Sequence, residues 1–285
     1  MRDIVTAIVV VIGCGAPGRD PSTAPDAGDD NTNPTGSNCS DAAKLVYTVD
    51  SNDTLSTFDP VSKQFVDLGT LDCPTTGLFA SPFSMGIDRN AGAWVLYSSG
   101  ELFRVDTTSL ACTATQWSSP AGLAQFGMGF STDAAGGSTD TLFIAGGAGP
   151  SDPTSALNRL DTTTMAPSRV GTVTGWPELT GTGNAELWGF FPSTNGSTPR
   201  VAKLDKATGA AVQTFNLPTL SGTPLAWAFA FFGGDYFVFL MRDIETSTTV
   251  YQIDGGNGAV KGMTATGTRN IVGAGVSTCA PVVIF

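Results

Sequence analysis

From Leu45 onward, apolar and polar residues alternate in short runs that predict strands. The apolar runs are rich in Val, Phe, Tyr and Trp, and clusters of Gly, Ser, Thr, Pro and Asp separate them. Such runs with such boundaries are typical of strands in a packed sheet. No stretch has the three-to-four-residue apolar spacing of an amphipathic helix. The pattern therefore predicts an all-β domain.

One phrase recurs along this region: an apolar residue, two variable residues, another apolar residue and an aspartate. It reads LSTFD, LFRVD, LNRLD, VAKLD and VYQID, at spacings of 47, 55, 44 and 49 residues. A polar turn and another apolar run follow each aspartate. About four strands per unit at this period is typical of a β-propeller. The repeated aspartates are Asp59, Asp106, Asp161, Asp205 and Asp254.

These aspartates have two interpretations, as metal ligands or as turn formers. We favour turns, because an Asp side chain accepts a hydrogen bond from its own backbone two residues on. One aspartate per repeat also places the five in a ring, where they do not converge on one ion.

Each complete repeat begins with a run of small residues, such as PFSMGID or QFGMGFS, and a longer apolar run follows it. The innermost strands of a propeller crowd around its axis, where glycine lets neighbouring backbones approach closely. We therefore assign the small-residue runs to inner strands. The five predicted inner strands lie near residues 83–88, 125–131, 178–183, 226–232 and 270–277.

The two ends of this region each supply part of one repeat. The 15 residues from Leu45 to Asp59 hold two strands and no inner strand, whereas the 31 residues after Asp254 hold an outer strand and an inner one. Together the two parts have the length of one repeat. The prediction is a five-bladed β-propeller closed by the C-terminal strand, which completes the first blade. Closure of this kind leaves no open sheet edge.

The first residues predict export. Arg2 and the apolar run 4–12 fit a signal peptide at residues 1–13, and the sequence up to Cys14 resembles a bacterial lipobox. The resemblance implies cleavage before Cys14 and lipidation of that cysteine, and several acyl chains hold a protein on a membrane stably. The alternatives are a plain signal peptide or a short buried strand. Gly15, in place of an aspartate, favours the outer membrane over the inner one.

Residues 14–38 predict a lipidated cysteine followed by a disordered linker, because Pro, Gly and Asp abound and no large apolar residue occurs. The propeller domain is then 39–285. This order of lipid, spacer and folded body is typical of a lipoprotein in the cell envelope, facing the periplasm or the surface.

Composition narrows the function classes. The net charge is −11 and charged residues make up 14% of the chain, so nucleic acid is excluded as a partner by its phosphate charge. Histidine is absent, which removes His-based triads and His-ligated zinc. No phosphate-binding glycine motif and no GxSxG nucleophile motif occur.

The cysteines predict two disulfides. With Cys14 lipidated, four remain, and an even number in an exported protein favours disulfides with three pairings open. The predicted fold favours Cys39–Cys279, because both flank neighbouring strands of the first blade. Cys73–Cys112 would then join adjacent blades. A zinc site is the alternative, but no CxxC spacing occurs.

A ligand site, if the domain has one, is expected where loops lead into the inner strands, at the mouth of the propeller channel. Aromatic side chains with a few polar groups suit a sugar or a peptide. The alternative is that these aromatic residues only fill gaps between blades. The candidate residues are Phe83, Gln125, Trp176, Glu178, Trp227, Arg269 and Asn270.

The phrases SPFSMGIDRNAGAWVLYSSGELFRVDT, ELTGTGNAELWGFFP and IVGAGVSTCAP resemble a group of uncharacterised bacterial lipoproteins common in myxobacteria-like genomes. The resemblance covers most of the chain after Lys44. It implies no known activity, so it assigns no catalytic residue.

These observations predict a membrane-anchored exported lipoprotein whose propeller is a monomeric binding module for a glycan or a protein, with no catalytic residues. The alternative is a sugar-directed hydrolase or lyase, which needs two carboxylates about 5–10 Å apart. Only Glu178 is well placed for that role. No cofactor is required by the spacing, although calcium could bind carbonyl and aspartate oxygens in the channel.

Overall fold

The computed structural model describes residues 39–120, 122–150 and 152–283, which all belong to one compact unit, 33–285. The predicted signal peptide 1–13, Cys14 and the linker 14–38 lie outside the described residues. Within those described ranges, no helix is long and apolar enough to cross a membrane.

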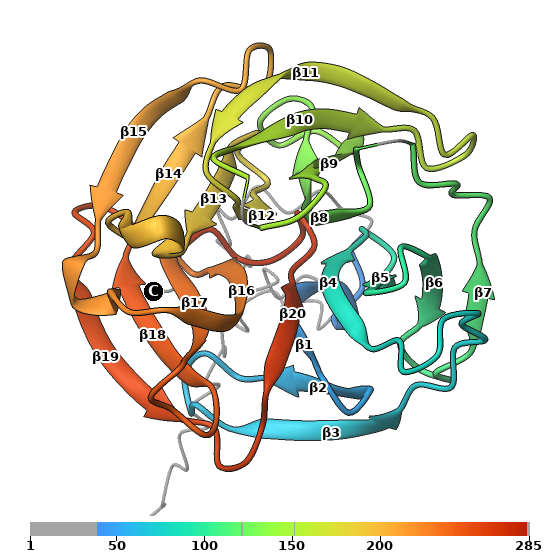
Figure 1. Ribbon diagram of the computed structural model, residues 1–285, viewed down its shortest axis with the longest axis horizontal. Coiled ribbons are helices and arrows are strands. Elements are labelled where there is room, and N and C mark those ends of the chain that lie inside the picture. Colours follow the sequence, from blue (N-terminus) through green and yellow to red (C-terminus); the bar gives the residue numbers. More distant parts are fainter. Residues whose placement is uncertain (1–38, 121, 151, 284–285) are drawn as a thin grey trace, which may run out of the picture. The chain divides into compact units, whose positions relative to one another are not determined.

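The described chain forms five antiparallel sheets of four strands each, arranged in a ring (Figure 1). From the inner strand outward, blade 1 is β20 (Ile271–Gly275), β1 (Val46–Asp50), β2 (Thr54–Phe58) and β3 (Phe65–Thr70). Blade 2 is β4 (Pro82–Ile87), β5 (Gly92–Tyr97), β6 (Leu102–Asp106) and β7 (Cys112–Ala114). Blade 3 is β8 (Gln125–Thr132), β9 (Asp140–Gly147), β10 (Thr154–Leu160) and β11 (Pro167–Thr174).

The remaining blades follow the same order. Blade 4 is β12 (Glu178–Gly181), β13 (Leu187–Phe191), β14 (Arg200–Leu204) and β15 (Ala211–Asn216). Blade 5 is β16 (Pro224–Phe232), β17 (Asp235–Arg242), β18 (Thr249–Asp254) and β19 (Val260–Ala265). In the part of the chain that the structure describes, three single-turn 3-10 helices lie between strands or before β1: η2 (Ala42–Lys44), η3 (Thr194–Gly196) and η4 (Pro218–Leu220).

The ring is closed by the pairing of β20 with β1, as predicted. Gly275 lies opposite Tyr47, Ala274 opposite Thr48 and Gly273 opposite Val49 in an antiparallel register. The five inner strands β20, β4, β8, β12 and β16 are successive neighbours around the axis (Figure 1). Each begins within two residues of the start predicted from the small-residue runs.

The small residues of the inner strands are there because neighbouring blades touch backbone to backbone. A Cβ on Gly127 in β8 would lie 2.2 Å from the carbonyl oxygen of Pro177 and 2.7 Å from the Cα of Glu178. A Cβ on Gly181 in β12 would lie 2.1 Å from the carbonyl oxygen of Phe130. Such distances leave no room for a side chain, so these positions require glycine.

The repeated aspartates form turns, as predicted. The carboxylate of Asp106 accepts hydrogen bonds from the backbone N–H groups of Thr108 at 2.9 Å and Ser109 at 2.8 Å. Asp59, Asp161, Asp205 and Asp254 each accept a bond from the N–H group two residues on. Each turn joins the third strand of a blade to its outer strand.

Both predicted disulfides are present. Cys39 and Cys279 are bonded with their Cα atoms 5.8 Å apart, and Cys73 and Cys112 with theirs 5.2 Å apart. Cys73 follows β3 in blade 1 and Cys112 begins β7 in blade 2, so the second bond joins adjacent blades.

We call the end of the ring where inner strands begin the mouth, and the opposite end, where they finish, the floor. The segment after β20, residues 276–281, runs across the floor. There, the carbonyl oxygen of Thr278 lies 2.8 Å from a Cβ built on Gly183, and Gly233 donates its N–H to the carbonyl oxygen of Pro281 at 2.7 Å. Arg89 and Asp140 bind Thr278 as well, so the segment contacts the first turn of blades 2 to 5.

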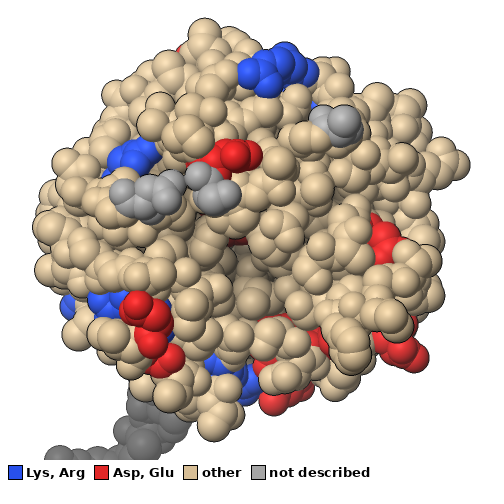
Figure 2. All heavy atoms as spheres, viewed as in Figure 1, with Lys and Arg blue, Asp and Glu red and all other residues tan. Residues whose placement is uncertain are grey.

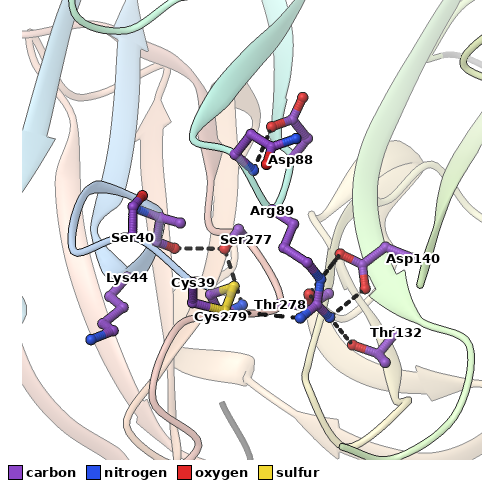
Figure 3. Close-up of a disulfide and its surroundings, with 12 residues drawn as sticks. Cys39, Ser40, Lys44, Asp88, Arg89, Thr132, Asp140, Ser277, Thr278 and Cys279 are labelled. Atoms are coloured by element: carbon purple, nitrogen blue, oxygen red, sulfur yellow. Dashed lines mark hydrogen bonds and ion pairs between the residues drawn. A yellow bond between two sulfur atoms is a disulfide. The ribbon is translucent and has the colours of Figure 1, made fainter. Parts of the chain in front are cut away.

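Arg89 is the centre of this floor cluster (Figure 3). Its Nη2 donates to Asp140 Oδ1 and to Thr278 Oγ1, each at 2.8 Å, and the ion pair with Asp140 is nearly buried. Cys39 and Cys279 lie beside it, and Ser277 donates its hydroxyl to the carbonyl of Ala43. The described chain therefore enters the propeller at the floor, opposite the mouth.

Candidate functional site

A pocket of about 240 Å³ lies at the mouth, where four of the inner strands begin. Phe83 in β4, Glu178 in β12 and Trp227 in β16 line it, together with Asn270 just before β20. In the view of Figure 2 the face is hollowed near the centre of the ring, and the visible Lys and Arg side chains lie toward the rim. The pocket is smaller than the roughly 300 Å³ at which sites for drug-sized ligands begin, so it suits one side chain or one chain end.

The structure brings four predicted site residues together, namely Phe83, Glu178, Trp227 and Asn270. The other three do not line this pocket. Trp176 is 1% exposed and packs against Gly147. Gln125 pairs with Gly147 at the start of β8, and Arg269 forms an ion pair with Asp67 at 2.7 Å.

Several lining residues are not among those predicted from the sequence. They are Ser51, Ser81, Pro82, Ser98, Leu225, Ala226 and Val272. Most lie beside a predicted position at the start of an inner strand, and that adjacency could have identified them. Ser51 and Ser98 instead follow the second strands β1 and β5, whose turns also reach the mouth.

Glu178 is the deepest polar group of the pocket, with 3% of its surface exposed. Its Oε2 accepts a hydrogen bond from the hydroxyl of Ser84, across the axis in β4, at 2.8 Å. Burial raises the pKa of Glu178 well above its usual range, and the bonds from Ser84 and from the N–H of Met128 oppose that shift only in part. The carboxyl group is therefore neutral over a wider pH range than an exposed glutamate.

Two other polar atoms of lining residues lack a hydrogen-bond partner among the described residues. They are Nε1 of Trp227 and Oδ1 of Asn270, and both atoms are buried. A buried polar group without a partner costs about 1–3 kcal/mol, so such groups are rare in folded proteins. An unpaired donor and an unpaired acceptor therefore belong to residues that line this pocket.

The raised pKa of Glu178 predicts a pH effect on stability. Because the folded pKa exceeds the unfolded one, of about 4.3, the stability contributed by the neutral carboxyl is complete below the unfolded pKa. It is lost as pH rises through the folded pKa. Glu178→Gln is therefore expected to remove a fall in the free energy of unfolding that wild type shows above about pH 4.3, measured by urea unfolding over a pH series.

Glu101→Gln is the control for this prediction. Hydrogen bonds from Ser99 and Thr76 lower the pKa of Glu101, so its contribution is present above the unfolded pKa and is lost as pH falls. The two variants should thus change the pH curve in opposite senses. A Glu178→Gln curve parallel to that of wild type would contradict the assignment.

Comparison with known proteins finds distant similarities in structure. No family model matches the chain, and no curated protein matches its sequence. A protein of unknown function from Bacteroides caccae matches with 8% identity and a TM-score of 0.49, over 82% of this chain and 98% of that one. The Dos1 propeller matches with 14% identity and a TM-score of 0.43, over 79% of this chain and 56% of that one.

A chain of the mitotic checkpoint complex is also similar, with 12% identity and a TM-score of 0.40, over 93% of this chain and 77% of that one. Similarities this distant carry no argument about function. The class of protein, a five-bladed β-propeller, follows from the strand pairing itself. A fold of this kind serves many functions, so the function depends on the residues of the mouth pocket.

Proposed function

We propose that this protein is an exported, lipid-anchored binding protein whose propeller mouth holds a peptide segment of a partner protein. The observation that carries the proposal is the mouth pocket, which combines two aromatic side chains, Phe83 and Trp227, with the buried polar groups of Glu178 and Asn270. Aromatic residues beside unpaired polar atoms are characteristic of sites that bind one small group tightly.

Exposed apolar side chains around the mouth support a protein partner. Leu225 lines the pocket and is 56% exposed, and Leu78 and Phe79 lie just before its lining residue Ser81. Ile244 lies at the same end, because β17 ends at Arg242 opposite the start of β16. Exposed apolar residues gathered around a polar pocket are typical of a protein-binding surface.

The backbone of Phe79 points to the same surface. Its φ is 62°, a left-handed conformation that costs a residue other than glycine about 1 kcal/mol or more. Its side chain is fully exposed, so no packing within the domain compensates for this strain. A contact with a partner would explain both the left-handed conformation and the exposure of Phe79.

The anchoring part of the proposal rests on the sequence of residues 1–38, with lipid on Cys14 and a location at the outer membrane. The described chain begins with Cys39, which is bonded to Cys279 at the floor. Cys39 thus lies at the end of the ring opposite the mouth pocket. We propose that a single propeller, acting as a monomer, presents this pocket to partners.

The hydrolase alternative draws no support from this pocket. Hydrolysis by two carboxylates needs a second acid about 5–10 Å from the first. Among the described residues that line the pocket, Glu178 is the one with a carboxyl side chain.

Binding of the full-length protein to peptide and glycan arrays tests the proposal. Peptide binding should weaken at least about tenfold in Trp227→Ala, because buried aromatic anchors carry much of the energy of an interface. Ile244→Ser should weaken it as well. Val212→Ser is the matched control, since Val212 is also an exposed aliphatic residue but lies on the outer strand β15.

Two outcomes would contradict the proposal. Peptide binding that survives Trp227→Ala would place the site elsewhere. Glycan binding that is lost in Trp227→Ala, with no peptide binding, would assign the pocket to a sugar.

A further inference from the structure

The residues that line the mouth pocket favour a positively charged ligand. Among the described residues that line it, Glu178 is the one ionisable side chain, and none is Lys or Arg. The side-chain oxygen atoms of its lining residues belong to the Glu178 carboxyl, the Asn270 amide and the hydroxyls of Ser51, Ser81 and Ser98. A ligand with a negative charge would meet the Glu178 carboxyl and no positively charged side chain among the described lining residues.

The aromatic residues favour a cation too. Phe83 and Trp227 line the same pocket, and aromatic faces attract an ammonium group most strongly in a site shielded from water. An ammonium group has three N–H donors. The Glu178 carboxylate and the unpaired Asn270 Oδ1 are acceptors for it.

The carboxyl of Glu178 has its protein partners but no counter-charge. The hydroxyl of Ser84 donates to Oε2, and the Met128 N–H also stabilises the charged form. Burial is the largest influence on the pKa of Glu178, and no charged group of the described residues contributes to the shift. An ammonium group in the pocket would supply the missing charge, and a buried ion pair with further hydrogen bonds is stable where a lone buried charge is not.

The unpaired Nε1–H of Trp227 narrows the range of fitting ligands further. It needs an acceptor, and a carbonyl oxygen next to the ammonium group would provide one. The α-ammonium group of a peptide lies beside its first carbonyl, whereas the ammonium group of a lysine side chain lies at the end of four methylene groups. The pocket therefore fits the end of a chain better than a lysine.

We infer that the mouth pocket captures the free amino terminus of a peptide, with Glu178 as counter-ion to its α-ammonium group, Asn270 Oδ1 as a second acceptor and Trp227 Nε1 as donor to its first carbonyl. This inference rests on the proposed function of the pocket. On binding, the O–H bond of Glu178 breaks and its proton passes to the buffer, while the peptide stays charged.

Calorimetry on the full-length protein tests this inference at about pH 6, where an α-amino group with a pKa of about 8 is charged. The probes are the tripeptide Ala-Leu-Gly amide, its N-acetylated form and acetyl-Lys-Gly amide. We expect the free peptide to bind at least about tenfold more tightly than either other probe. Titrations in two buffers of different ionisation enthalpy should show net release of protons when the free peptide binds.

Glu178→Gln should weaken binding of the free peptide about tenfold or more and abolish proton release, with binding of the acetylated peptide unchanged. Glu101→Gln, at an exposed carboxylate that does not line the pocket, should behave as wild type. Equal binding of free and acetylated peptides would overturn the inference, and so would equal binding of the lysine probe.

The inference and the proposed function fail in different ways. If acetylated and free peptides bind equally and Trp227→Ala abolishes both, the pocket is a peptide site that ignores the amino terminus. If no peptide binds wild type, both the amino-terminal assignment and the peptide-binding function are wrong.

Discussion

Replacing Cys39 and Cys279 by serine lowers the free energy of unfolding by about 5 kcal/mol, on the loop-entropy relation for a bond that closes nearly the whole domain. The two cysteines are 240 residues apart in the sequence, and Cys279 is fully buried. The bond restricts the unfolded chain strongly and also holds the floor segment in place. Urea unfolding of the full-length protein measures the loss.

The second disulfide is the matched control for this prediction. Cys73 and Cys112 are 39 residues apart, so the same relation gives about 4 kcal/mol for their replacement by serine. Replacing Cys39 and Cys279 should therefore cost more stability than replacing Cys73 and Cys112. Only the replacement of Cys39 and Cys279 should loosen the floor segment. A smaller loss for Cys39–Cys279 than for Cys73–Cys112 would show that the floor segment does not depend on its disulfide.

Replacing Arg89 by methionine is expected to cost about 3–5 kcal/mol of stability, because it leaves the nearly buried Asp140 without its charged partner. The same guanidinium group also donates to Thr278 and to Gly137, so the floor segment loses a bond as well. The free energy of unfolding, measured in urea at neutral pH, checks the value. Arg89→Met/Asp140→Leu should recover part of the loss, since it removes both buried charges.

Arg104→Met is the control. Arg104 pairs with Asp88 at 3.3 Å and is half exposed, so its loss should cost no more than about 1 kcal/mol. If Arg89→Met and Arg104→Met lowered the free energy of unfolding equally little, the floor cluster would contribute no more stability than a surface ion pair does.

The architecture could be predicted because each repeat carries its own local signals. Asp106 and its four equivalents form the same turn wherever the phrase occurs, so the period alone counts the blades. Gly127 and Gly181 lie where backbones of neighbouring blades meet, which is why small residues mark the inner strands. Ring closure then followed from the lengths of the two incomplete ends.

The floor could not be predicted in the same way. Residues 276–281 have no periodic pattern, and their burial comes from contacts with turns of four different blades. Arg89 gives no local signal either, because its partners Asp140 and Thr278 are 51 and 189 residues away in the sequence. Contacts of this kind depend on the closed ring and are not visible in any one repeat.

Only part of the candidate site could be predicted, because the remaining contacts also depend on the folded ring. Glu178 and Trp227 were found because the starts of inner strands must lie at the mouth. Which of these side chains reach the pocket depends on where each loop leaves the ring. Trp176, two residues before Glu178, is buried against Gly147 instead, while Ser98 reaches the pocket from a turn that follows β5.

Native-state hydrogen exchange of the backbone amides in β20 tests whether the C-terminal strand closes the ring on β1. We expect β20 amides to be protected to within about 1 kcal/mol of those of the inner strand β8, because opening the closed ring exposes both. Amides of β20 that exchange as fast as a frayed chain end, while those of β8 stay protected, would contradict it.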